Sequence, residues 1–177
     1  RNPSKPLIED RLFVLDKYKK NLEIKDLDCG EQPPVLSIFR GFSAPVIWET
    51  DLSVDDYLFL FLNDNDYFTR WDSGQFLMRE MIKTRINNKI DDTLEDSFVN
   101  AIKQSIKYLK NKDPSFLANL LTIPGFSELE SLFEKVDPIK IYNTSLNFKV
   151  SVGIKILQDL RTLSNNVSIN IDQEWPI

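Results

Sequence analysis

The sequence contains no histidine and a single cysteine, Cys29. Without an imidazole, the chain cannot build a Ser-His-Asp or Cys-His nucleophile or the HExxH zinc motif. One cysteine excludes an internal disulfide and a cysteine-rich zinc site, and it is typical of a reducing compartment. We therefore expect no catalytic, cofactor-binding or metal-binding residue in this chain, and we expect it to be cytoplasmic.

Long apolar runs and basic clusters are also absent. The longest apolar run covers Tyr57–Leu62 and is far too short to cross a bilayer, and the N-terminal residues lack the apolar core of a signal peptide. The formal net charge is −5, and Lys and Arg are not clustered. These features predict neither a membrane nor a nucleic acid as a partner.

Carboxylates are the one abundant class of side chain that could act in acid–base catalysis. Close pairs that could work as acid and base are Asp55 with Asp56, Asp64 with Asp66, Asp91 with Asp92, and Glu128 with Glu130. We favour a structural interpretation, because acidic residues are common at helix starts and on solvated surfaces. The stretch Asn63–Asp66 lacks the Gly and the distal Glu of a calcium-binding EF-hand, so it predicts a turn between helices.

The stretch Gly41-Phe42-Ser43-Ala44-Pro45 has the first three positions of the nucleophile elbow G-x-S-x-G. Pro45 stands where that motif requires its second Gly, and no histidine is available to act as the base. A Ser-Lys pair stays formally open, although nothing in the sequence places a lysine beside Ser43. We therefore do not expect Ser43 to be a catalytic nucleophile.

The pattern of apolar residues changes near residue 50. Before this point, short alternating or β-branched segments at residues 11–16, 21–27 and 44–50 predict strands, and Pro33 and Pro34 interrupt them. Three or four short strands are too few for an independent sheet with two covered faces. Residues 1–50 are therefore predicted to form a short, partial β-sandwich segment.

After residue 50 the period becomes helical, and helix-start signals recur. They are Ser53 with Asp56, Asp66, Asp113-Pro114, Ser127 with Glu130, and Asp137-Pro138. Gly74 interrupts the second helix and predicts a close crossing there. The long last helix carries an apolar stripe formed by Ile139, Tyr142, Leu146, Val150, Leu157 and Leu160. We predict a mainly α fold, with antiparallel helical hairpins stacked as a layered bundle or superhelix.

Residues 33–75 closely resemble zinc aminopeptidases of the alanyl aminopeptidase (aminopeptidase N) type from bacteria and apicomplexan parasites. The shared pattern reads P-x-P-S-x-x-R-G-F-S-A-P-V and, after a helix, D-x-F-x-R-W-x-x-x-Q. The matching residues are Pro34, Ser37, Arg40, Gly41, Phe42, Ser43, Ala44, Pro45, Val46, Asp66, Phe68, Arg70, Trp71 and Gln75. Residues 117–141 are similar to a second pattern, L-T-L-P-S-x-x-x-L followed by a V-D-P helix start. Leu36 and residues 83–97 depart from the family pattern.

The resemblance implies that residues 1–50 end a small β-sandwich domain and that residues 51–177 begin a C-terminal helical domain. In such enzymes the zinc ligands lie in a preceding catalytic domain, and none of them maps onto this chain. The resemblance thus implies zinc as the cofactor, peptides as the substrates and the remaining domains as the partners of a parent enzyme. Residues Arg40–Pro45 would form a structural junction, with Arg70, Trp71 and Gln75 in the same family motif.

Two functions from different classes remain. In the first, the chain is a non-catalytic fragment of a zinc aminopeptidase, and its helices wall the active-site chamber and restrict access. In the second, it is a free-standing helical protein-interaction module. Coding sequence upstream of Arg1 would discriminate between them. In the first, helices further along the parent chain would cover the last helices seen here, so we expect an exposed apolar patch or a partner chain there, and self-association through such a patch.

Overall fold

The computed structural model describes residues 12–24, 33–135 and 137–165, and most of these residues lie in helices. Within these residues it contains six α-helices and one 3-10 turn. Their bounds are η1 (Arg40–Phe42), α1 (Val54–Asn63), α2 (Tyr67–Ile86), α3 (Asp92–Leu109), α4 (Pro114–Leu120), α5 (Phe126–Glu130) and α6 (Pro138–Asn165). The mainly α prediction is confirmed.

Most helices begin where the sequence predicts, because a side chain accepts a free amide of the first turn. Ser53 and Asp56 form the predicted capping box of α1, with the Asp56 N–H donating to Ser53 Oγ at 3.2 Å. Asp113 accepts the Phe116 N–H at 2.8 Å, directly before Pro114 opens α4. Asp137 accepts the Ile139 N–H at 2.9 Å at the start of α6. Each cap offsets part of the cost of unpaired amides, by about 1 kcal/mol.

The predicted capping box of Ser127 with Glu130 is wrong. Helix α5 begins at Phe126, and its N-cap is Gly125. The Glu128 carboxylate accepts the Gly125 N–H at 3.1 Å, so the acidic residue that serves the cap stands two positions earlier than predicted. Pro124 explains the shift, because it fixes the backbone just before Gly125 and lets the helix start at once.

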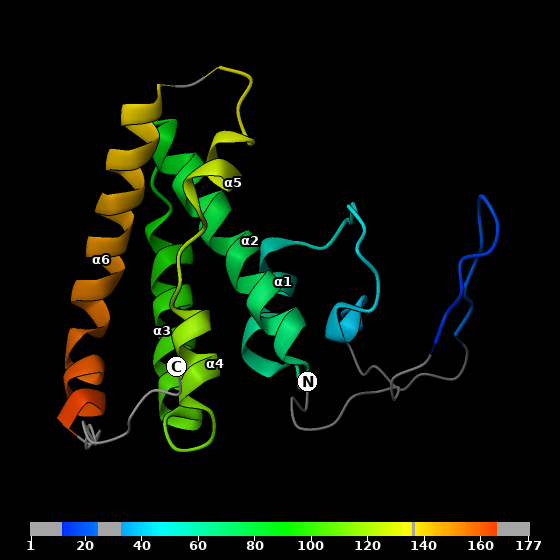
Figure 1. The fold of residues 1–177 in the computed structure, drawn as a ribbon, viewed down its shortest axis with the longest axis horizontal. Helices are drawn as coiled ribbons and strands as arrows, with labels where there is room; N and C mark the ends of the chain where they lie inside the picture. The colour runs from blue at the N-terminus through cyan, green and yellow to red at the C-terminus, as the bar shows by residue number, and fades with distance from the viewer. Residues whose placement is uncertain (1–11, 25–32, 136, 166–177) are drawn as a thin grey trace, which may run out of the picture.

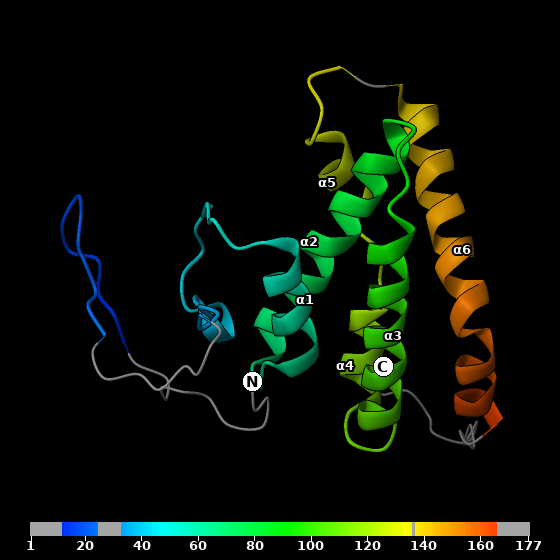
Figure 2. The ribbon, with the colours of Figure 1, turned by 180° about the vertical axis from the view of Figure 1, so that it is seen from behind.

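Helix α2 lies at the centre of the packing. It contacts α1, α3, α4, α6 and the η1 turn, and α6 packs on α2, α3 and α5. Figures 1 and 2 show the same order from both sides, with α3 between α6 and α2, and α1 beyond α2. Side chains with no more than 1% exposure fill the space between these helices: Phe61, Leu77, Ile82, Phe98, Leu109, Leu129, Ile141 and Phe148.

Helix α6 turns a different face to the core than the predicted stripe. Its buried residues are Ile141, Phe148, Val152 and Ile156. Most of the predicted stripe lies on the opposite side and is exposed: Ile139, Tyr142, Leu146, Val150 and Leu157. Both faces have helical spacing, so periodicity identifies the helix but cannot choose the face that packs. The expected exposed apolar patch is therefore present.

The strands predicted at residues 11–16, 21–27 and 44–50 are not present in the described part of the chain. Residues 12–24 form an exposed loop that stands apart from the helices, and residues 44–50 form no strand. Residues 11 and 25–27 lie outside the described residues. An alternating pattern is compatible with a strand but does not form one alone, because the backbone N–H and C=O groups need a neighbouring strand as hydrogen-bond partners. No such partner exists among the described residues.

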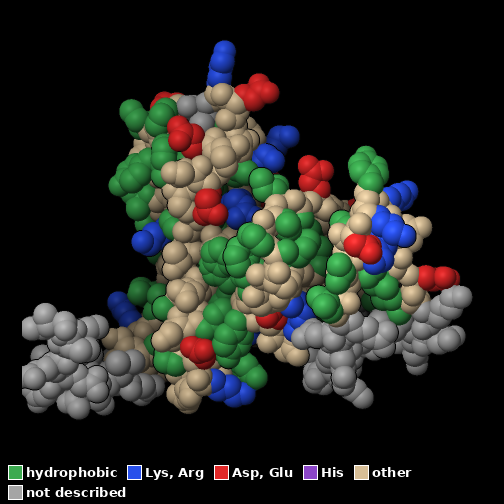
Figure 3. Space-filling model, turned by 45° about the vertical axis from the view of Figure 1, so that its right-hand side comes forward, with side chains coloured by type: hydrophobic (Ala, Val, Ile, Leu, Met, Phe, Trp, Pro, Cys, Tyr) green, Lys and Arg blue, Asp and Glu red, His purple; other side chains and the backbone are tan. Residues whose placement is uncertain are grey.

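Surface chemistry agrees with the charge analysis. Acidic and basic side chains are interspersed with exposed hydrophobic ones on the face in Figure 3, with no large area of one charge. None of the helices in the described ranges is both long and apolar enough to cross a bilayer.

Candidate functional site: the junction at Arg40

The family-like motif forms a tight turn where the connecting segment meets the helices. Three residues of this turn have positive φ: Phe39 at 54°, Gly41 at 61° and Phe42 at 55°. The Ser43 N–H donates to the Arg40 carbonyl at 3.2 Å and closes the turn. Positive φ is costly for a bulky residue, so surrounding contacts must hold Phe39 and Phe42 in place.

Arg40 supplies the strongest of these contacts. Its Nη1 lies 2.6 Å from Asp64 Oδ1 and donates to Ser37 Oγ at 3.0 Å. Its Nη2 donates to the side-chain oxygen of Asn65. Asp64 and Asn65 form the corner between α1 and α2, so one guanidinium ties the motif turn to that corner.

Asp66 links the same turn to the start of α2. Its Oδ1 accepts the Gly41 N–H at 3.0 Å, and its Oδ2 accepts the Thr69 N–H at 2.8 Å. Burial works to raise the pKa of Asp66, but the amides of Thr69 and Gly41 and the nearby Arg40 outweigh it, so the pKa lies below its ordinary value. The ionised Asp66 carboxylate is thus both a helix cap and a clamp on the turn.

Ser43 shows no nucleophile geometry. The residue is exposed, and its hydroxyl has no hydrogen-bond partner among the described residues. Beyond it, the Val46 N–H donates to the Ala44 carbonyl at 3.0 Å, which makes a second tight turn centred on Pro45. Among the described residues, neither a lysine nor a carboxylate is hydrogen-bonded to the Ser43 hydroxyl.

The remaining motif residues fasten α2 to its neighbours. Arg70 is 4% exposed and donates to the Phe61 carbonyl at 2.9 Å and to Ser105 Oγ at 3.1 Å. Gln75 donates to the Thr122 carbonyl at 2.8 Å. Each hydrogen bond pairs a buried polar group, and burying that group without a partner would lower the stability of the fold. These polar side chains can therefore lie buried between helices.

Aromatic side chains join the motif turn to the same helix. The ring centroids of Phe42 and Phe68 lie 5.2 Å apart, and those of Phe68 and Trp71 lie 5.9 Å apart. Offset and tilted aromatic pairs at such distances add about 0.5–1.5 kcal/mol each. The motif residues at 40–42 and those at 66–75 thus meet as one junction.

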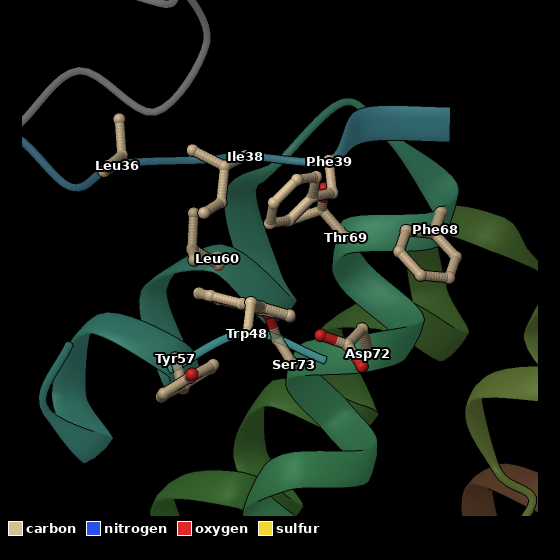
Figure 4. Close-up of a pocket in the computed structure, with 10 residues that line it drawn as sticks. All are labelled: Leu36, Ile38, Phe39, Trp48, Tyr57, Leu60, Phe68, Thr69, Asp72 and Ser73. Carbon is tan, nitrogen blue, oxygen red and sulfur yellow. The ribbon is translucent and has the colours of Figure 1, made fainter. Parts of the chain in front are cut away.

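A small hollow lies beside this junction, under the connecting segment (Figure 4). Its volume is about 20 Å³, which leaves room for about one water molecule. The lining residues are Leu36, Ile38, Phe39, Trp48, Tyr57, Leu60, Phe68, Thr69, Asp72 and Ser73. A hollow of this size and apolar lining is too small to hold a peptide.

Asp72 is the notable group in this hollow, and sequence reasoning missed it. Burial among apolar side chains raises the pKa of its carboxyl group, although Arg79 acts in the opposite direction. Asp72 has no hydrogen bond or ion pair within the described residues. Its position next to Trp71, inside the family-like motif, could have identified Asp72 from the sequence.

A second polar cluster, also missed from the sequence, joins α3 to α2 and α6. Glu95 is 2% exposed and accepts from Ser151 at 2.8 Å and from Lys155 at 3.0 Å, and it forms an ion pair with Arg85. These contacts outweigh burial and hold the pKa of Glu95 below its ordinary value. Its signal in the sequence was its place on the buried stripe with Phe98.

One carboxylate of each predicted pair caps a helix, in agreement with the structural interpretation. Asp56, Asp66, Asp91 and Glu128 each accept a backbone amide at a helix start. Across the described ranges, no three His, Cys, Asp or Glu side chains gather closely enough to hold a metal ion. Because the sequence has no histidine and a single cysteine, its residues do not match the donor set of a His-containing or Cys-rich zinc site, and we derive no step of zinc chemistry for them.

The chain is similar to known proteins over most of its length. Residues 54–174 match the family described as "Domain of unknown function (DUF3458_C) ARM repeats". The chain is 34% identical to aminopeptidase N of Caulobacter vibrioides over 164 residues, which are 93% of this chain and 18% of that protein. It is 26% identical to aminopeptidase N of Escherichia coli over 139 residues, 75% of this chain and 15% of that protein.

A solved structure has the same arrangement of helices. It is the crystal structure of Legionella pneumophila aminopeptidase A in complex with aspartic acid, with a TM-score of 0.59 at 22% identity. The match covers 77% of this chain and 16% of that one. The chain thus spans less than a fifth of the length of these relatives. It belongs to the ARM-repeat family matched by residues 54–174, and it is homologous to the C-terminal helical region of aminopeptidase N.

Proposed function

We propose that this chain is the non-catalytic helical part of a zinc-dependent aminopeptidase that removes N-terminal residues from peptides. The observation that carries the proposal is 34% identity to an aminopeptidase N over 93% of the chain. Because the sequence has no histidine, the zinc and the base for its water would come from another part of the parent protein. Zinc, the peptide substrates and the cytoplasmic location stay predictions.

Within that parent, the helices would form a wall of the active-site chamber and restrict it to short peptides. The ARM-repeat description supports a layered stack of helical hairpins, in which each layer contacts its neighbours. The junction at Arg40 would fix this stack to the preceding domain. Apolar residues beside the junction suit such a contact, since Phe42 is 58% and Ile47 is 102% exposed.

The native size of the protein tests the proposal first. An immunoblot of source cells with an antibody against residues 54–135 should detect a band far larger than 20.6 kDa, the mass of this chain. A band near 20.6 kDa without a larger precursor would contradict the proposal. It would favour a free-standing interaction module, for which the exposed apolar face of α6 is the specific observation.

Activity measurements test the division of labour. The isolated chain with added zinc should release no residue from an alanyl reporter substrate, whereas the larger protein should do so. In the larger protein, Arg40→Ala should loosen the wall and raise the kcat/KM for a long peptide relative to that for the short reporter. The control Lys20→Ala, in the exposed loop, should leave this ratio unchanged. Zinc-dependent cleavage by the isolated chain, free of contaminants, would refute the proposal.

A further inference from the structure

We draw no further inference here: the strongest candidate, the open groove between the first turns of α1 and α3 with the exposed carboxylates of Asp55 and Asp91 on its rim, is an acidic surface to which no second observation assigns a ligand, and nothing among the described residues shows what covers it.

Discussion

Two helices of this molecule carry a glycine near their middle, and the surroundings of these glycines are opposite. Gly74 in α2 lies against the ring of Phe61, which is fully buried. Gly153 in α6 faces open space. Helix α2 is enclosed by α1, α3, α4 and α6, whereas α6 packs on one side only. Among the described residues, helices thus surround α2, whereas one face of α6 is exposed, and only Gly74 marks a close crossing.

Phe148→Ala should have the largest effect, because Phe148 fills the inner face of α6 with 1% exposure. Truncation leaves a cavity and should lower the free energy of unfolding by about 3–5 kcal/mol. Tyr142→Ala, on the exposed face of α6, should change the free energy of unfolding by no more than about 0.5 kcal/mol. Urea unfolding at low protein concentration measures both. Equal losses would mean that the two faces of α6 are not different in solution.

Glu95→Gln should have the next largest effect, since it removes the charge that holds Arg85 and Lys155 between three helices. We expect a loss of about 3 kcal/mol at neutral pH. Asp96→Asn removes the exposed partner of Lys155 and should cost less than about 1 kcal/mol. If both variants lose less than about 1 kcal/mol of unfolding free energy, the contacts of Glu95 do not stabilise the packing of α6.

The pH dependence of Glu95 has a defined sign. Its folded pKa lies below the ordinary value of 4.5, so its stabilisation is complete above that value. The stabilisation is lost as the pH falls through the folded pKa. The difference between the original chain and Glu95→Gln should therefore shrink at acidic pH. A difference that grows below pH 4.5 would contradict the contacts drawn around Glu95.

Local signals in the sequence were sufficient for most helix starts. Ser53, Asp66 and Asp113 each accept an amide within three residues, so neighbours along the chain decide the outcome. The packed face of α6 could not be predicted in the same way, because both of its faces are apolar. The buried face of α6 is set by its contacts with α2 and α3, and a local sequence pattern contains no information about these contacts.

In the candidate site, too, local features could be predicted from the sequence and long-range contacts could not. Arg40 and Asp66 could be found from their resemblance to a family motif, and Asp66 also from its cap position. The pairing of Arg40 with Asp64 could not, since it joins residues 24 apart in the chain. The partners of Glu95 include Ser151, which is 56 residues away. The strands were predicted from alternation alone, without a partner strand to complete their ladders.

Alanine at the two glycines tests the comparison directly. Gly74→Ala should lower the free energy of unfolding by about 1–3 kcal/mol, because the buried Phe61 ring cannot move away freely. Gly153→Ala should raise it by up to about 1 kcal/mol through helix propensity. Both are measured by urea unfolding at low protein concentration. If both variants change the free energy of unfolding in the same direction, the two glycines do not differ in their packing.

Asp72→Asn should have the smallest effect, because Asp72 is only half-buried. Burial raises the pKa of Asp72 above the ordinary value of 3.8, so the folded state binds more protons than the unfolded state just above that value. Stability contributed by this group therefore falls as the pH rises. Arg79 offsets only part of the cost of burying this charge, so Asp72→Asn should raise the urea midpoint slightly at neutral pH.

Asp66→Asn is the matched opposite of Asp72→Asn on the same helix. The folded pKa of Asp66 lies below 3.8, so its stabilisation is present at neutral pH and lost as the pH falls. Asn at position 66 should lower the urea midpoint at neutral pH, and the two variants should approach the original chain from opposite sides at acidic pH. If Asp72→Asn also lowers the midpoint at neutral pH, the attraction between Arg79 and the Asp72 carboxylate outweighs the cost of burying that carboxylate.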